Sequence, residues 1–210
     1  MSIRTLDPEA TRNAILDAAE ELFAASGFAA VSISDIARRA VVTKSLIHHH
    51  FGSKVDLWRA AKARGLDEFF AAQTRLLETR EPDATLLRDS IEMYFRFLQQ
   101  RPRVVRLMQW VRIEGDEGAT EAGCDVIRLG ARWIEVAQRR GLVRPDVSPS
   151  YVIASFIAAV EGWFQIRAGF SSVLHDDPDT SDEAFLATWL ALFLRGVAAD
   201  ATADTPPVQD

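Results

Sequence analysis

Apolar residues recur every three or four positions along the whole chain, and no stretch alternates apolar and polar residues for long. This spacing places apolar side chains on one face of an α-helix, whereas a half-buried strand requires alternation. Between residues 12 and 26, for example, the apolar stripe consists of Ile15, Ala19, Leu22 and Phe23. The pattern predicts an all-α fold of about nine helices.

Glycine, proline and capping residues indicate where these helices begin and end. Gly27 ends the first helix, and Phe28 is placed to fold back on Phe23, as in a Schellman motif. Residues 171–181 are expected to form a loop, and residues 201–210 a disordered tail. The remaining helices are expected at residues 33–40, 44–50, 53–79, 83–101, 102–115, 119–140, 149–170 and 182–199.

Only three residues, 41–43, connect the two short helices at 33–40 and 44–50. This is the spacing of a helix-turn-helix, whose second helix enters the major groove of DNA. Ser32 begins a capping box on the first helix, and Thr43 caps the second. Spacing alone leaves an alternative open, which is a helical hairpin with a solvated polar face.

Helical geometry divides the second short helix into two faces. Ile47 and Phe51, four residues apart, face inward. The outward face carries short polar groups and a cation near a helix N-terminus, which suits phosphates and base edges. The residues expected to contact DNA are Ser32, Thr43, Lys44, Ser45, Leu46, His48, His49, His50 and Lys54.

A set of apolar, capping and glycine positions keeps a fixed spacing through the first 57 residues. These positions are Arg12, Ile15, Leu16, Ala18, Ala19, Leu22, Phe23, Gly27, Phe28, Ser32, Ile33, Ile36, Ala37, Ala40, Val42, Thr43, Lys44, Ile47, His50, Phe51, Ser53, Lys54 and Leu57. With them the sequence resembles the N-terminal DNA-binding domain of the TetR-like (tetracycline-repressor-type) transcriptional regulators. The resemblance implies a homodimer that binds a palindromic operator, usually as a repressor that a small ligand releases.

Several positions depart from the family pattern. Val41 stands where the turn often carries glycine, and a β-branched residue disfavours positive φ. Leu46 is large for a base-facing position, although it suits a thymine methyl group. His48 and His49 stand where tyrosine is frequent. We therefore expect a turn that is packed more tightly or aimed slightly differently.

The middle of the chain, residues 80–140, is rich in aromatic residues and methionines. Such residues form either an adaptable apolar pocket or plain core. The family resemblance favours a cavity within these helices, which would hold a small apolar or aromatic effector. The residues expected to contact this effector are Met93, Phe97, Met108, Trp110, Arg112 and Trp133.

The helices at 149–170 and 182–199 carry apolar faces wider than a single core contact needs. A four-helix contact with a second copy of the chain would bury the additional face. The resemblance implies the same dimer. The residues expected in this interface are Phe156, Val160, Trp163, Phe164, Trp189 and Phe193.

Charge and composition limit the other classes of function. The net charge is −6, yet the first 60 residues balance seven basic against seven acidic residues. If either part of the chain binds a polyanion, this charge distribution favours the first 60 residues, but the charge alone does not decide between nucleic acid and other partners. No signal peptide or membrane span is evident, so a cytoplasmic protein that contacts no membrane is expected. No cofactor is expected.

Catalytic and metal sites find little support in the sequence. Residues 48–50 are three consecutive histidines, which point about 100° apart on a helix and do not converge on one ion. Cys124 is the only cysteine, so a disulfide within the chain is excluded. None of the motifs G-x-S-x-G, H-E-x-x-H and the Gly-rich phosphate loop occurs, and we expect no enzyme and no metal site.

The sequence thus predicts a helix-turn-helix DNA-binding domain at residues 1–57 and a helical effector-binding and dimerisation domain at 58–200. The function it favours is a sequence-specific transcriptional regulator, most simply a repressor that a small molecule releases from its operator. An effector-independent regulator and an activator remain open. A helical small-molecule-binding protein or enzyme with a merely structural N-terminal bundle is the alternative from another class.

Overall fold

The computed structural model describes residues 7–83, 85–115, 121–174 and 177–199. Within these ranges the chain forms nine α-helices and, apart from one isolated bridge between Val143 and Ala198, no β-structure, which confirms the all-α prediction. None of the described helices is long and apolar enough to cross a membrane. The helices are α1 (Pro8–Ala30), α2 (Ile33–Ala40), α3 (Lys44–Phe51), α4 (Lys54–Thr79), α5 (Leu86–Gln100), α6 (Pro102–Ile113), α7 (Glu121–Arg139), α8 (Pro149–Leu174) and α9 (Pro178–Val197).

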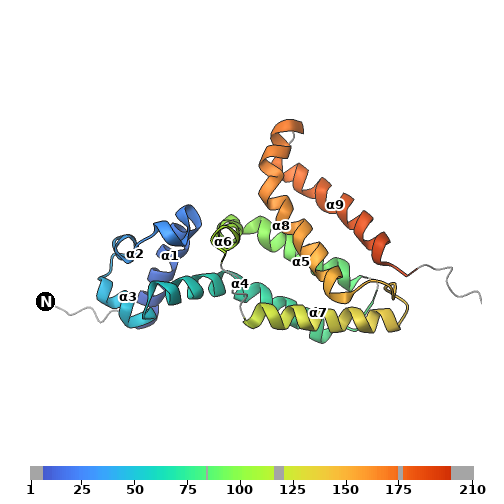
Figure 1. Ribbon diagram of the computed structural model, residues 1–210, viewed down its shortest axis with the longest axis horizontal. Coiled ribbons are helices and arrows are strands. Elements are labelled where there is room, and N and C mark those ends of the chain that lie inside the picture. Colours follow the sequence, from blue (N-terminus) through green and yellow to red (C-terminus); the bar gives the residue numbers. More distant parts are fainter. Residues whose placement is uncertain (1–6, 84, 116–120, 175–176, 200–210) are drawn as a thin grey trace, which may run out of the picture. The chain divides into compact units, whose positions relative to one another are not determined.

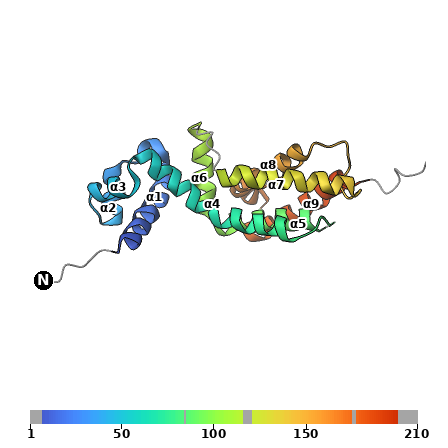
Figure 2. The same cartoon turned by 90° about the horizontal axis from the view of Figure 1, so that it is seen from below.

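The contacts within the chain divide it into two compact units. The first unit comprises Met1–Glu68 and Gln100–Thr120, and the second comprises Phe69–Gln99 and Glu121–Asp210. In the first unit, α1, α2 and α3 gather around the beginning of α4 (Figures 1 and 2). Helix α6 belongs to the first unit, although the sequence analysis assigned residues 58–200 to the second domain. The expected tail at 201–210 lies outside the described residues.

An aromatic cluster forms the core of the first unit. The ring of the fully buried Phe23 lies 5.0 Å from that of Trp58, edge to face, and 6.2 Å from that of Phe28. The predicted contact between Phe23 and Phe28 is therefore confirmed. The predicted Schellman end is wrong, because Gly27 has φ 78° and ψ 175° instead of a left-handed helical conformation. The chain then makes one more short helical turn, as far as Ala30.

Helix α6 packs on this interruption in α1. The indole Nε1 of Trp110 donates to the backbone oxygen of Ala24 at 3.3 Å, and Glu114 accepts from the backbone N–H of Ala29 at 3.0 Å. A Cβ atom on Gly27 would lie 2.7 Å from the Trp110 ring. Both the positive φ and this close approach therefore require glycine at position 27.

The predicted loop at 171–181 is wrong, because α8 extends to Leu174 and α9 already begins at Pro178. Ser171 and Ser181 are buried, and their hydroxyl oxygens are 3.3 Å apart. Two of the polar residues that suggested a solvent-exposed loop are therefore buried inside the protein. Asp177 caps α9, since its side chain accepts from the backbone N–H of Thr180 at 3.4 Å.

Stacked aromatic rings join α5, α8 and α9 in the second unit. Trp163 of α8 stacks on Phe185 of α9, with ring centroids 4.3 Å apart and an interplanar angle of 5°. Phe95 of α5 is fully buried and its ring lies 5.0 Å from that of Phe164. Helices α8 and α9 run side by side as a pair (Figure 1). These contacts form the core of the second unit.

Candidate nucleic-acid interface

Side-chain caps define both short helices of the predicted helix-turn-helix. Ser32 accepts from the backbone N–H of Asp35, whose carboxylate accepts in return from the backbone N–H of Ser32, which makes a capping box. Hydrogen bonds from Ser32 lower the pKa of Asp35, with a further contribution from Arg38, so this carboxylate stays ionised at neutral pH. Thr43 accepts from the backbone N–H of Leu46 at 3.3 Å. The predicted bounds of α2 and of the beginning of α3 are confirmed.

The turn between the two helices places a valine where glycine fits best. Val41 has φ 56° and ψ 43°, which is the left-handed conformation, and its side chain is 90% exposed. The backbone N–H of Val42 donates to the oxygen of Ala37 at 3.0 Å and closes the turn. The turn thus keeps the backbone that a glycine would adopt, and the β-branched Val41 is strained in it.

We expect Val41→Gly to stabilise the protein by about 1 kcal/mol, because glycine relieves the left-handed strain and no buried contact is lost. Urea denaturation of the two proteins measures the difference in unfolding free energy. Val42→Gly is the matched control, since Val42 is half-buried against the core, and it should destabilise. If Val41→Gly were less stable than the wild-type protein, the backbone at Val41 would not be strained.

Only one residue of α3 is fully buried, and the other residues of this helix are half-buried or exposed. Ile47 is 1% exposed and anchors the helix in the core of the first unit. Leu46 and His50 are half-buried. The exposed residues at the helix N-terminus and along the outer face are Thr43, Lys44, Ser45, His48 and His49. The predicted division of α3 into an inward and an outward face is confirmed at Ile47.

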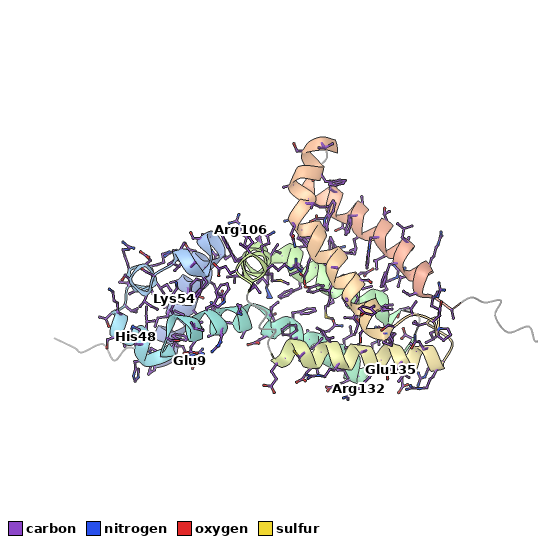
Figure 3. The ribbon with its side chains drawn as sticks, in the orientation of Figure 1. Glu9, His48, Lys54, Arg106, Arg132 and Glu135 are labelled. Atoms are coloured by element: carbon purple, nitrogen blue, oxygen red, sulfur yellow. The ribbon has the colours of Figure 1, made fainter. Side chains whose placement is uncertain are left out.

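His48 has a second role that spacing did not reveal. Its Nδ1 lies 2.8 Å from the backbone oxygen of Gly52, and because a carbonyl oxygen only accepts, Nδ1 carries the hydrogen. Nε2 of the neutral ring is then an acceptor. This bond ties the end of α3 to the turn that leads into α4, where Lys54 lies (Figure 3).

The predicted contact residues Ser32 and Lys54 are partly engaged within the protein. The Ser32 hydroxyl belongs to the capping box of α2. The ammonium group of Lys54 lies 4.2 Å from the centre of the Phe28 ring, in a cation–π contact. The hydroxyl of Ser53 accepts from the backbone N–H of Asp56 at 3.1 Å, so Ser53 caps α4 as predicted.

Ion pairs hold α1 against α2 and α4. Arg64 pairs with Asp17 and Glu20, each at 2.7 Å, and the hydrogen bond to Glu20 is the main cause of the raised pKa of Arg64. Arg39 pairs with Glu21 at 2.6 Å. These pairs link residues 18 to 47 positions apart, so no local pattern identified them.

Family models match both parts of the chain. Residues 15–61 match the bacterial regulatory proteins of the tetR family, and residues 88–193 match the tetracyclin repressor-like C-terminal domain. The HTH-type transcriptional repressor Rv3405c of Mycobacterium tuberculosis is 32% identical over 178 residues, which cover 83% of this chain and 82% of that protein. The chain belongs to the TetR family.

Two further similarities agree with TetR-family membership. The HTH-type transcriptional activator FasR of Mycolicibacterium smegmatis is 32% identical over 97 residues, which cover 46% of this chain and only 44% of that protein. A crystal structure of the transcriptional regulator SCO4942 from Streptomyces coelicolor has a TM-score of 0.69 and 25% identity, covering 87% of this chain and 97% of that one. As a TetR-family member, the protein is a DNA-binding transcriptional regulator.

The residues predicted to contact an effector do not belong to one unit of this TetR-family chain. Met108, Trp110 and Arg112 lie on α6 in the first unit, and Trp110 is engaged with α1. Met93, Phe97 and Trp133 lie on α5 and α7 in the second unit. The sequence pattern did not show that α6 packs with the DNA-binding helices.

Three of the residues predicted at a dimer interface belong to the core of a single chain. Val160, Trp163 and Phe164 are all at most 6% exposed without any partner. Their burial therefore needs no second copy, and their place in a dimer interface stays a prediction. The other three, Phe156, Trp189 and Phe193, are half-buried. Among the described side chains of α8 and α9, the strongly exposed apolar residues are Tyr151, Ile166, Phe170, Val173 and Leu192, none of which was among the six predicted interface residues.

Proposed function

We propose that this TetR-family protein is a homodimeric repressor that binds palindromic operator DNA through α3 and releases it when a small molecule binds in the second unit. The observation that carries the proposal is the outward face of α3. A single buried anchor, Ile47, leaves the polar and cationic residues at the helix N-terminus exposed. A helix of this kind fits the major groove.

The α3 side chains divide into two kinds of contact. Lys44 is the first residue of α3 and lies beside free backbone N–H groups, so it suits a phosphate. Ser45 and His49 are exposed further along the outer face and suit base edges. His48 presents Nε2 and anchors the α3–α4 turn through Nδ1.

Dimerisation is supported by the apolar residues that α8 and α9 expose. Phe170 is 52% exposed, Leu192 68% and Val173 77%. Scattered exposed apolar residues are ordinary, but these lie on two adjacent helices. Two copies of this pair would bury them in a four-helix contact. A dimer brings two α3 helices to the two halves of a palindrome.

Repression is favoured over activation by the extent of similarity. The repressor from M. tuberculosis matches 83% of this chain, whereas the match to the activator from M. smegmatis covers 46%. Release by a small molecule is supported by the match of residues 88–193 to a tetracyclin repressor-like domain. Helix α4 has residues 54–68 in the first unit and 69–79 in the second, and coupling through this helix is part of the proposal.

We expect Lys44→Gln to reduce the slope of log affinity against log salt concentration by about one, because one phosphate contact is lost. Fluorescence anisotropy with DNA from upstream of the protein's own gene measures this slope. Arg128→Gln is the matched control, since Arg128 is an exposed cation of the second unit, and its slope should equal that of the wild type. Equal slopes for all three proteins would show that Lys44 makes no phosphate contact. Weak binding to all DNA sequences alike would refute the proposed function.

A further inference from the structure

Two buried polar atoms of the second unit stand out among the described residues. Gln73 on α4 is 5% exposed and Trp133 on α7 is 8% exposed. The side-chain oxygen of Gln73 and the indole Nε1 of Trp133 have no hydrogen-bond partner in the part of the chain that the structure describes. Buried polar groups are almost always paired, so each of these two requires an explanation.

The ends of α4 and α7 show that the two groups lie at the same level. Arg140, directly after α7, pairs with Glu81 and donates to the backbone oxygen of Pro82 at 3.3 Å, just beyond the end of α4. Gln73 precedes Thr79, the last residue of α4, by six residues, and Trp133 precedes Arg139, the last residue of α7, also by six. At 1.5 Å per residue both lie about 9 Å back from the helix ends that this contact joins.

Both side chains point into the second unit. Trp133 is buried, whereas its neighbours Arg132 and Glu135 are exposed on the outer side of α7 (Figure 3). One turn before Gln73, Phe69 packs its ring 5.0 Å from those of Tyr94 and Phe97. An aromatic cluster therefore lies one turn of α4 away from Gln73.

Among the described residues of the second unit, the buried carboxylates are those of Glu161 and Asp182, and both are paired. Glu161 accepts from the Tyr94 hydroxyl at 2.5 Å. Asp182 accepts from Trp163 and Arg167 at 2.7 and 2.6 Å. Because a charged ligand would need a buried counter-charge, an uncharged ligand fits this interior better.

We propose that Gln73 and Trp133 are the polar contacts of a small-molecule site, which takes an uncharged, mainly aromatic ligand with one hydrogen-bond donor and one acceptor. The donor, such as a hydroxyl, binds the oxygen of Gln73, and the acceptor, such as a carbonyl, binds Nε1 of Trp133. The inference rests on the proposed function, because this ligand is the effector of the repressor. Neither residue would be replaceable by an apolar one without loss of response.

The first test needs no ligand and uses an apolar replacement of similar size. Gln73→Met removes an unpaired buried polar group without leaving a cavity, so it should raise the melting temperature of the ligand-free protein. Gln138→Met is the control, since the Gln138 amide donates to the backbone oxygens of Arg144 and Val147 at 3.0 and 2.8 Å. It should lower the melting temperature. A fall in Gln73→Met would mean that the Gln73 oxygen is paired and would overturn the proposal.

The second test uses three probes, 4′-hydroxybutyrophenone, 4′-methoxybutyrophenone without the donor, and 4-butylphenol without the acceptor. By calorimetry the first should bind the wild-type protein about tenfold more tightly than either other probe. Gln73→Met should abolish the preference for the hydroxyl, and Trp133→Phe the preference for the ketone. Equal binding of the three probes, or none, would overturn the proposal.

Operator binding, measured by anisotropy in parallel, separates this inference from the proposed function. If the wild-type protein binds its operator but binds the three probes equally, the ligand site at Gln73 and Trp133 is refuted and the proposed function is retained. If the three probes bind with the expected preferences but no specific operator binding is found, the proposed function is refuted instead. Release of the operator by 4′-hydroxybutyrophenone, lost in both variants, supports both.

Discussion

Replacing Asp182 with alanine is expected to destabilise the second unit by about 3 kcal/mol, the cost of breaking a buried ion pair. The Asp182 carboxylate is fully buried and accepts hydrogen bonds from Trp163 at 2.7 Å, Arg167 at 2.6 Å and Gln99 at 3.2 Å. These donors come from α8 and α5, while Asp182 lies on α9. Its removal leaves an indole N–H and a guanidinium group without their acceptor.

Urea denaturation measures this loss, and the neighbouring residue provides a matched control. Glu183 is an exposed carboxylate whose pKa is lowered by its ion pair with Arg96. Because exposed pairs contribute little, Glu183→Ala should change the unfolding free energy far less. Equal effects of the two substitutions would show that the network around Asp182 does not hold α5, α8 and α9 together.

Replacing Gly27 with alanine is expected to destabilise the first unit by about 3 kcal/mol or more. The backbone at Gly27, with φ 78° and ψ 175°, lies in a region that is essentially restricted to glycine and costs other residues about 1–3 kcal/mol. A Cβ atom there would also approach the Trp110 ring to 2.7 Å. The contact of α6 with α1 must therefore open, and operator affinity should fall with it.

Gly115→Ala separates backbone strain from steric overlap. Gly115 also has a positive φ, 64°, but a Cβ atom there would meet nothing within 4 Å. Its replacement should cost about 1 kcal/mol, the penalty of the left-handed conformation alone. Combining Gly27→Ala with Trp110→Leu should then recover part of the lost stability. If Gly27→Ala costs no more than Gly115→Ala, the close packing of α6 on α1 is refuted.

Local rules account for most of the helices and for the helix-turn-helix. Apolar spacing, capping by Ser32 and Thr43 and the break at Gly27 act over a few residues, so the sequence shows them directly. The prediction of a loop at 171–181 was wrong because Ser171 and Ser181 are buried and face one another. Local polarity does not reveal a polar residue whose partner lies in another helix.

Long-range packing explains the remaining errors. Met108 and Trp110 were assigned to an effector site because they are apolar and aromatic, but the sequence did not show which helices they pack against, and the structure places α6 on α1. Likewise, the wide apolar faces of α8 and α9 contain both core residues such as Trp163 and exposed ones such as Leu192. Periodicity gives the width of a face, whereas its division between a core and a partner depends on tertiary contacts.

The central claim is that two copies of α3 read the two halves of an operator. Selection of preferred sites from random DNA, with the wild-type protein and His49→Ala, tests this claim most directly. The wild-type protein should return a palindrome whose half-sites are about one helical turn, roughly 34 Å, apart. His49→Ala should return the same spacing with altered bases within each half-site. A non-repeated motif, or no motif at all, would contradict the account.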